Sequence, residues 1–288
     1  MSAARPFGVP HPGGACHLTP LAEFASWPQH KRDAAYDNTA AVATSARQLN
    51  ALEAAGRQLA AGAACQLDLC HGPAERQRFD FFVGRPGAPT LVFVHGGYWQ
   101  MRHKNTFRAV VAGALEHGLS AALIGYTLAP QARLTGIVRE VRDALRHVRA
   151  HAVGQGASDR LLVSGWSAGA HLAALCLDED AVAAGLGISG IYDLAPIRLT
   201  YLDRALGLCE DEVRGLSPLV LPLSPKPFVI VHGLADLAEL QGQSQAFAAR
   251  RRHLPGPLVT VPGADHFSVL QSLAQARGAA LRALLAFS

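Results

Sequence analysis

The sequence predicts an α/β fold built on an eight-stranded, mostly parallel sheet flanked by helices. From about Gln66 onward, short β-branched or apolar runs alternate with stretches whose apolar residues recur at helical spacing, which is the pattern of βαβ units. The 288 residues are 50% hydrophobic and only 17% charged, which excludes disordered, collagen-like and coiled-coil chains. A chain of this length can bury a large core without disulfides.

Eight runs are predicted to be strands because each is short, apolar and bounded by turn residues. They are Gln66–Leu69, Arg78–Val83, Thr90–Val94, Ala121–Tyr126, Arg160–Ser164, Ala184–Ser189, Phe228–His232 and Leu258–Val261. Helical stretches separate or follow them, at about Asn105–His117, Gly136–His151, Ala168–Leu177, Leu240–Leu254 and Phe267–Ala286. Parallel strands need such crossovers, so the order of elements supports the predicted sheet.

Two segments lie outside this alternation. Residues 1–62 begin with a Pro- and Gly-rich part, and the spacing of Leu49, Leu52 and Leu59 predicts a helix near its end. Residues 192–227 contain five prolines and too few apolar periods for a core of their own, so they are expected to form a cap over the site. The chain 1–288 is therefore predicted to be a single domain with an N-terminal helical extension and a cap insertion.

Charge and cysteine content bear on the expected binding partners and the cellular location. The net charge is +4, and the longest basic run, residues 250–253, ends a helical stretch and lacks the wide stripe that nucleic acids require. The cysteines are odd in number and show no spacing typical of zinc, so reduced thiols and a cytoplasmic location are expected. They are Cys16, Cys65, Cys70, Cys176 and Cys209.

Membranes are also not expected as partners. Residues 1–14 hold no apolar stretch typical of a signal-peptide core, and no apolar run has the length that spans a bilayer. The expected partner is a small-molecule substrate, with no metal and no organic cofactor. The sequence leaves a homodimer open as the assembly.

Residues 165–169 read Gly-Trp-Ser-Ala-Gly, a G-x-S-x-G pattern between a predicted strand and a predicted helix. In this setting the pattern is typical of a nucleophile elbow, which exposes the serine hydroxyl at the end of a sheet. The glycines permit the tight turn, and the helix N-terminus stabilises negative charge. Ser167 is therefore the candidate nucleophile, and a structural turn is the alternative.

A second glycine motif, H-G-G-Y-W at residues 95–99, follows an apolar strand. Loops at this place supply the other half of an oxyanion hole. We expect the backbone N–H groups of Gly97, Tyr98 and Ala168 to converge on the developing oxyanion. His95 is expected to fix the turn and not to act as a catalyst.

The serine needs a general base and an acid. His266 fits the base because it follows the last strand and precedes the final helix, as the chain order Ser, acid, His requires; His232, at the end of a strand, is its rival. Asp236 follows the penultimate strand and is the predicted acid, and Asp193, after the preceding strand, is the alternative. Asp265 is expected to cap the last helix.

With these residues assigned, the sequence resembles the α/β-hydrolase kynurenine formamidases (arylformamidases) and the bacterial esterase-like proteins grouped with them. The resemblance covers most of the chain and rests on residues 95–99, 125–130, 165–169, 189–194, 265–267 and Tyr36-Asp37-Asn38. It implies the α/β-hydrolase fold and places Ser167, Asp236 and His266 at the catalytic triad positions. It also implies cleavage of an aryl formamide of the N-formylkynurenine kind.

Two departures from that family bear on the substrate. Residues 239–244 read E-L-Q-G-Q-S where relatives often show E-F-x-R-Q-S, and Trp166 stands where a smaller polar ring such as His is common. Trp99 and Trp166 are candidates for the wall of an aromatic substrate pocket, with packing around the elbow as the alternative. The predicted activity is hydrolysis of a small amide or ester, first an aryl formamide. A short-chain carboxylesterase and a non-catalytic ligand-binding protein are the alternatives.

Overall fold

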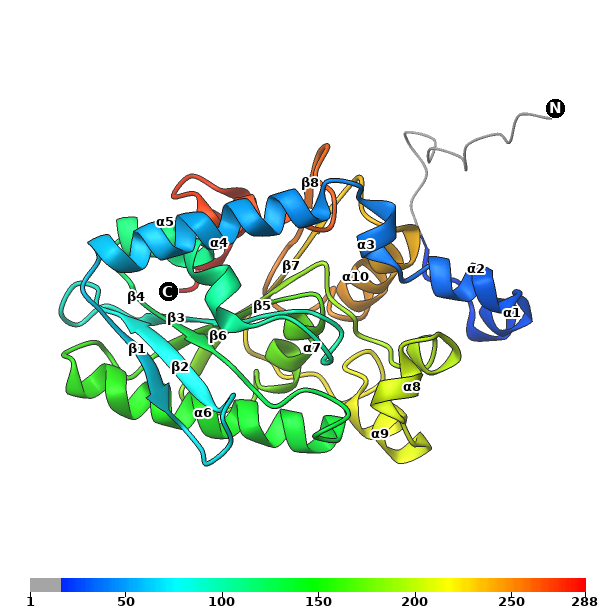
Figure 1. Cartoon of the computed structure of the whole chain (residues 1–288), viewed down its shortest axis with the longest axis horizontal. Coiled ribbons are helices and arrows are strands. Elements are labelled where there is room, and N and C mark those ends of the chain that lie inside the picture. The colour runs from blue at the N-terminus through cyan, green and yellow to red at the C-terminus, as the bar shows by residue number, and fades with distance from the viewer. Residues whose placement is uncertain (1–16) are drawn as a thin grey trace.

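The computed structural model describes residues 17–288, so Cys16 and residues 1–14, both used in the sequence interpretation, lie outside the described part. The described chain is built around one sheet with the strand order β1-β2-β4-β3-β5-β6-β7-β8 (Figure 1). The strands are β1 (Cys65–Cys70), β2 (Arg78–Phe82), β3 (Thr90–Val94), β4 (Ser120–Ile124), β5 (Leu161–Trp166), β6 (Val182–Ile188), β7 (Phe228–Gly233) and β8 (Leu258–Val261).

The sheet is mostly parallel, as predicted. Strand β2 is antiparallel to β1 and to β4, and every other neighbouring pair is parallel. Strands β3, β4, β5 and β7 are buried along their whole length. Strands buried on both faces read as continuous apolar runs, which is why periodicity found them in the sequence.

Helices cover both faces of the sheet (Figure 1). One face packs against α6 (Leu134–Gly154), α7 (Ala168–Leu175) and α10 (Ala238–Arg250). The other packs against α4 (Ser45–Gly62), α5 (Ala112–Glu116), α11 (Gln271–Ala274) and α12 (Ala279–Leu285). Helix α6 shows why such helices pack on the sheet. Its buried residues recur every three or four positions and form one apolar stripe.

Two predicted helices differ from the observed ones. The stretch 105–117 is a 3-10 helix, η1 (Lys104–Val111), followed by α5, and apolar periodicity over so few residues does not separate 3-10 from α geometry. The stretch 267–286 is not one helix but η3 (Ser268–Leu270), α11 and α12. The chain turns tightly before α12, where a Cβ on Gly278 would lie 2.1 Å from the carbonyl oxygen of Ser272.

The segments outside the alternation are helical. The N-terminal one holds α1 (Leu21–Ser26), α2 (Gln29–Ala34) and α3 (Asn38–Ala41) before α4, and residues 192–227 hold η2 (Ile197–Leu199), α8 (Asp203–Leu206) and α9 (Glu210–Leu216). The two segments meet, since the Tyr201 N–H donates to Asp33 Oδ1 at 2.7 Å. That residues 192–227 act as a cap within a single domain stays a prediction. Among residues 17–288, no helix has the length and apolar character needed to cross a membrane.

Candidate active site

Ser167 lies in a strained turn between β5 and α7, with φ of +56° and ψ of −120°. A non-glycine residue rarely adopts a positive φ, and such strain often marks a functional position. The flanking glycines make the turn possible: a Cβ on Gly165 would lie 2.1 Å from the carbonyl oxygen of Gly169, and a Cβ on Gly169 would lie 2.0 Å from that of Val94. The serine is thus placed at the carboxyl end of the sheet, at the start of a helix.

The carboxyl ends of β7 and β8 bring together the predicted acid and base. His266 Nδ1 lies 3.0 Å from Asp236 Oδ2, and both side chains are buried. Because a carboxylate only accepts hydrogen bonds, Nδ1 carries the proton and Nε2 is left with its lone pair when the ring is neutral. His266 Nε2 has no hydrogen-bond partner within residues 17–288. The pair therefore presents an oriented imidazole with one free basic nitrogen.

Further contacts hold Asp236 in place. Its Oδ1 accepts the Leu237 N–H at 2.8 Å, at the start of α10. Its backbone carbonyl accepts the side-chain amide of Gln241 at 2.8 Å, from the first turns of the same helix. Gln241 was not singled out from the sequence, although it lies in the segment whose departure from the family pattern was noted. These bonds fix the carboxylate on which the His266 orientation depends.

The alternative acid and the rival base make hydrogen bonds with other groups. Asp193 Oδ1 accepts the Ala195 N–H at 2.9 Å, within its own loop, and burial raises the pKa of the Asp193 carboxyl. His232 Nδ1 lies 3.1 Å from the carbonyl oxygen of Gly233, and burial lowers the pKa of His232. His266 Nδ1 thus donates its hydrogen bond to Asp236 and not to Asp193. Asp265 Oδ1 accepts the N–H groups of Phe267 and Ser268 at 2.9 and 2.7 Å. It therefore caps the short 3-10 helix η3 and not the last helix, α12, which it was expected to cap.

The loop after β3 runs against the elbow. A Cβ on Gly96 would lie 2.9 Å from Ser167 Cβ, and Gly97 adopts a φ of +112°. Within residues 17–288, the backbone N–H groups of Gly97, Tyr98 and Ala168 donate to no backbone acceptor outside regular elements. These three groups are the predicted oxyanion donors, and their convergence on an oxyanion stays a prediction.

His95 is placed as a structural residue of this loop. Its Nδ1 lies 2.7 Å from the carbonyl oxygen of Gly96, and its ring stacks on Tyr126 with 4.4 Å between centroids. Burial lowers the pKa of His95 to about 3. The ring is therefore neutral at physiological pH, which agrees with the expectation that His95 fixes the turn.

Both candidate substrate-binding tryptophans are buried. Trp99 packs edge-on against His171 with 5.0 Å between ring centroids. The indole N–H of Trp166 donates to the backbone carbonyl of His266 at 2.8 Å, and the two rings lie 4.9 Å apart. Trp166 therefore has a packing role beside the base, which the sequence had left open, while substrate contact by either indole stays a prediction.

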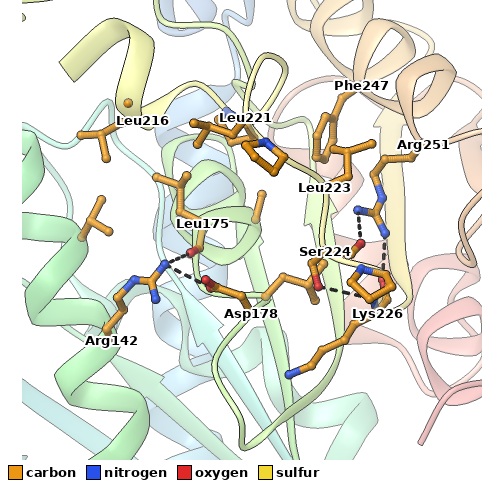
Figure 2. A pocket seen from close by; sticks show the side chains of 17 residues that line it. Arg142, Leu175, Asp178, Leu216, Leu221, Leu223, Ser224, Lys226, Phe247 and Arg251 are labelled. Atoms are coloured by element: carbon orange, nitrogen blue, oxygen red, sulfur yellow. Dashed lines mark hydrogen bonds and ion pairs between the residues drawn. The ribbon is translucent and has the colours of Figure 1, made fainter. Parts of the chain in front are cut away.

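A cavity of about 540 Å³ lies away from these residues, between α6, α7, α9 and α10 (Figure 2). Neither Ser167 nor His266 lines it. Its cationic walls are engaged by the chain itself: Arg142 bonds Asp178 at 3.1 Å, and Arg251 bonds the carbonyl oxygens of Ser224 and Lys226 at 3.2 and 2.8 Å. Within residues 17–288, no group of three or more His, Cys, Asp or Glu side chains is arranged to hold a metal ion.

Comparison with known proteins finds similarity to formamidases and esterases. The family model BD-FAE matches residues 83–181. A kynurenine formamidase from Salmo salar is 29% identical over 230 residues, which cover 72% of this chain and 76% of that protein. The esterase LipQ from Mycobacterium tuberculosis is 27% identical over 249 residues, covering 73% of this chain and 59% of the esterase.

The fold itself is shared with solved structures. A crystal structure of a protein from Silicibacter sp. TM1040 superposes with a TM-score of 0.78 at 24% identity and covers 88% of this chain and 98% of that one. At this identity the likeness concerns the fold alone. The eight-stranded, mostly parallel sheet with helices on both faces is the α/β-hydrolase fold that the sequence predicted.

Proposed function

We propose that this chain, an α/β-hydrolase similar in sequence to kynurenine formamidases, is a serine hydrolase that cleaves a small amide or ester bond, and that its preferred substrate is an aryl formamide. The observation that carries the proposal is the buried pair of His266 and Asp236, 3.0 Å apart, with His266 Nε2 unpartnered among the described residues. Ser167 stands at the elbow after β5, at the same carboxyl edge of the sheet, and among the described residues no hydrogen bond joins its hydroxyl to His266 Nε2. This is the set of groups that acyl transfer to serine requires.

In the first half of the reaction, Ser167 Oγ attacks the substrate carbonyl carbon while His266 Nε2 takes the hydroxyl proton. Asp236 accepts the Nδ1–H and stabilises the imidazolium that forms. The carbonyl π electrons move to oxygen, and the N–H groups of Gly97, Tyr98 and Ala168 are the donors for that oxyanion. Collapse of the intermediate breaks the C–N bond, and His266 gives its proton to the leaving amine.

In the second half, water replaces the amine. His266 Nε2 removes a proton from the water as its oxygen attacks the acyl group on Ser167. Collapse of this second intermediate breaks the bond to Ser167 Oγ, which regains its proton from His266. For a formyl group the products are formate and the free enzyme. Each step uses only groups of this chain, the substrate and water.

Two observations support a small acyl group. Similarity to kynurenine formamidases extends over 72% of the chain, and Ser167 and His266 are each only 1% exposed. A formyl group is the smallest acyl group, so it needs the least free space beside a covered nucleophile. A long acyl chain would need a groove at Ser167.

Similarity to the esterase LipQ favours a second candidate, a broad carboxylesterase acting on short acyl esters. The same three side chains would serve, because only the leaving group changes from an amine to an alcohol. A non-catalytic binding protein is the weaker alternative, since ligand binding alone does not require an imidazole oriented by a buried carboxylate.

The test compares kcat/KM of the purified full chain on N-formylkynurenine, formanilide and p-nitrophenyl esters of increasing acyl length, with Ser167→Ala as the blank. The proposal expects the highest value on the aryl formamide and a fall with acyl length among the esters. Turnover of esters without any formamide hydrolysis would make the chain a carboxylesterase. No turnover of either, together with measurable ligand binding, would make it a binding protein.

A further inference from the structure

The oxyanion loop of residues 97–99 is held in an unfavourable backbone conformation. Tyr98 has a φ of +50° and Trp99 a φ of +58°, and neither is a glycine. Side-chain-bearing residues avoid this region, so the surrounding structure must impose it. Since the Tyr98 N–H is a predicted oxyanion donor, the contacts that impose this conformation also set the direction of that N–H.

The contact that anchors Tyr98 comes from the N-terminal extension. The phenol hydroxyl of Tyr98 donates to the backbone carbonyl of Tyr36 and accepts the side-chain amide of Asn38 at 3.0 Å. All three residues are buried. A buried hydroxyl with both a donor and an acceptor engaged has one orientation, so the ring of Tyr98 is fixed at its far end.

The N-terminal segment is in turn fixed to the acid side of the site. The Tyr36 hydroxyl accepts the side-chain amide of Gln243 at 3.1 Å. Gln243 lies on α10, the helix that starts directly after Asp236 and Leu237, and its own oxygen accepts the N–H groups of Tyr192 and Asp193 at 2.9 and 2.7 Å. Through these bonds one helix supports both the acid and the loop that carries the oxyanion donors.

We propose that Tyr36 and Asn38 are positioning residues that hold Tyr98 so that its backbone N–H faces the developing oxyanion. The inference rests on the proposed serine hydrolase function and adds to it a role for the N-terminal extension. Neither residue reaches the reacting atoms through its side chain. Both act through the hydroxyl of Tyr98, which explains why a tyrosine stands at a position where only the backbone is needed for chemistry.

The test removes this anchor in two ways and follows p-nitrophenyl acetate hydrolysis. Tyr98→Phe deletes the hydroxyl, and Asn38→Ala deletes one of its partners. Each is expected to lower kcat about tenfold with KM changed less than about twofold, a smaller loss than the factor of about 10²–10³ seen when an oxyanion donor itself is removed. The double variant is expected to lose little more than Tyr98→Phe alone, because both changes break the same contact.

A second readout separates positioning from general loosening. Trifluoroacetophenone forms a tetrahedral adduct whose oxyanion needs the same donors, so its Ki is expected to rise by the factor by which kcat/KM falls. The control is Asp37→Ala, which removes the cap that Asp37 Oδ1 provides to the Ala40 N–H at 2.9 Å in the same segment. This control is expected to lower thermal stability while kcat stays within about twofold.

Several results would overturn the inference. Full kcat in well-folded Tyr98→Phe would show that the hydroxyl does not aim the loop. Equal losses in Asp37→Ala and Asn38→Ala would show that only the stability of the segment matters. If Tyr98→Phe does not fold, the same criterion is applied to Asn38→Ala and Asn38→Asp. Full kcat in these variants, when well folded, would show that the contact to the Tyr98 hydroxyl does not position the loop. Activity that survives Ser167→Ala would refute the proposed function itself, a result distinct from each of these.

Discussion

The indole N–H of Trp166 donates to the backbone carbonyl of His266 at 2.8 Å, so the residue before the elbow serine binds the loop that carries the imidazole. The two residues are 100 positions apart in the chain. The contact joins the end of β5 to the loop after β8, across the edge of the sheet. It gives a structural role to the large indole at position 166.

Trp166→Phe is therefore expected to lower kcat by about tenfold, because the loss of one hydrogen bond of about 1 kcal/mol leaves the His266 carbonyl buried without a donor. Stability should fall by about 1–3 kcal/mol from the same loss and the smaller ring. The measurements are steady-state kinetics on p-nitrophenyl acetate and urea unfolding.

The matched control is Phe107→Leu, which removes another ring packed on Trp166, at 5.4 Å, without touching this hydrogen bond. It should lose comparable stability and much less kcat. Equal losses of kcat in both variants would mean that packing, and not the hydrogen bond, is what His266 needs.

Ser167→Ala is expected to remove nearly all turnover while the unfolding midpoint stays close to that of the wild type. The hydroxyl contributes chemistry, and the strained turn is made possible by the glycines around it. Turnover of p-nitrophenyl acetate and thermal unfolding are measured on the same preparation. Activity above that of a matched blank would exclude Ser167 as the nucleophile.

Low pH should destabilise the fold through protonation of His171. Burial lowers the pKa of His171 to about 4, and its Nε2 lies 2.7 Å from the carbonyl oxygen of Leu216. The unfolded chain, with a histidine pKa of about 6.5, binds more protons than the folded chain between the two values, so the free energy of unfolding falls as the pH is lowered through this window. The contribution is about 1.4 kcal/mol per pH unit.

Urea unfolding between about pH 7 and pH 4 measures this slope. His171→Gln keeps a donor for the Leu216 carbonyl but cannot titrate. The slope of its unfolding free energy against pH should therefore be smaller by about the contribution of one proton. His95, whose pKa burial lowers to about 3, adds a slope of the same sign that remains in the variant. Identical slopes in wild type and variant would show that His171 is not buried as a neutral ring.

The sequence predicted the sheet well because its strands are buried on both faces and read as apolar runs separated by helical periods. It also predicted which strand ends carry Ser167, Asp236 and His266, since parallel strands place their carboxyl ends at one edge. It was wrong about a continuous final helix, because the close approach of Gly278 to Ser272 is a tertiary feature without a periodic signal.

The supporting contacts of the site were beyond sequence reasoning for a related reason. The hydrogen bond from Asn38 to Tyr98 joins residues 60 positions apart, and the bond from Gln243 to Tyr36 joins residues 207 apart. No spacing rule links such pairs, because only the folded chain brings them within reach. A resemblance at Tyr36-Asp37-Asn38 marked the segment but not its contact.

The last prediction concerns the acid. Asp236→Asn should lower kcat strongly with the fold preserved, because an amide cannot stabilise the imidazolium and can hold His266 in the wrong tautomer. The corresponding change in a serine protease costs a factor of about 10⁴ in kcat. Asp193→Asn is the matched control: among residues 17–288 its carboxyl bonds only the Ala195 N–H of its own loop, at 2.9 Å, an acceptor role that the asparagine oxygen retains.

The two variants are compared by kcat and by circular dichroism. Asp193→Asn should keep kcat within about threefold, since the neutral side chain also avoids the desolvation that raises the pKa of Asp193 in the wild type. Asp236→Asn leaves the Leu237 N–H an oxygen to bond, so its fold should persist while the 3.0 Å contact to His266 Nδ1 loses its charge. The reverse ranking, in two variants with native spectra, would move the acid to the loop after β6 and would make the His266–Asp236 contact a structural one.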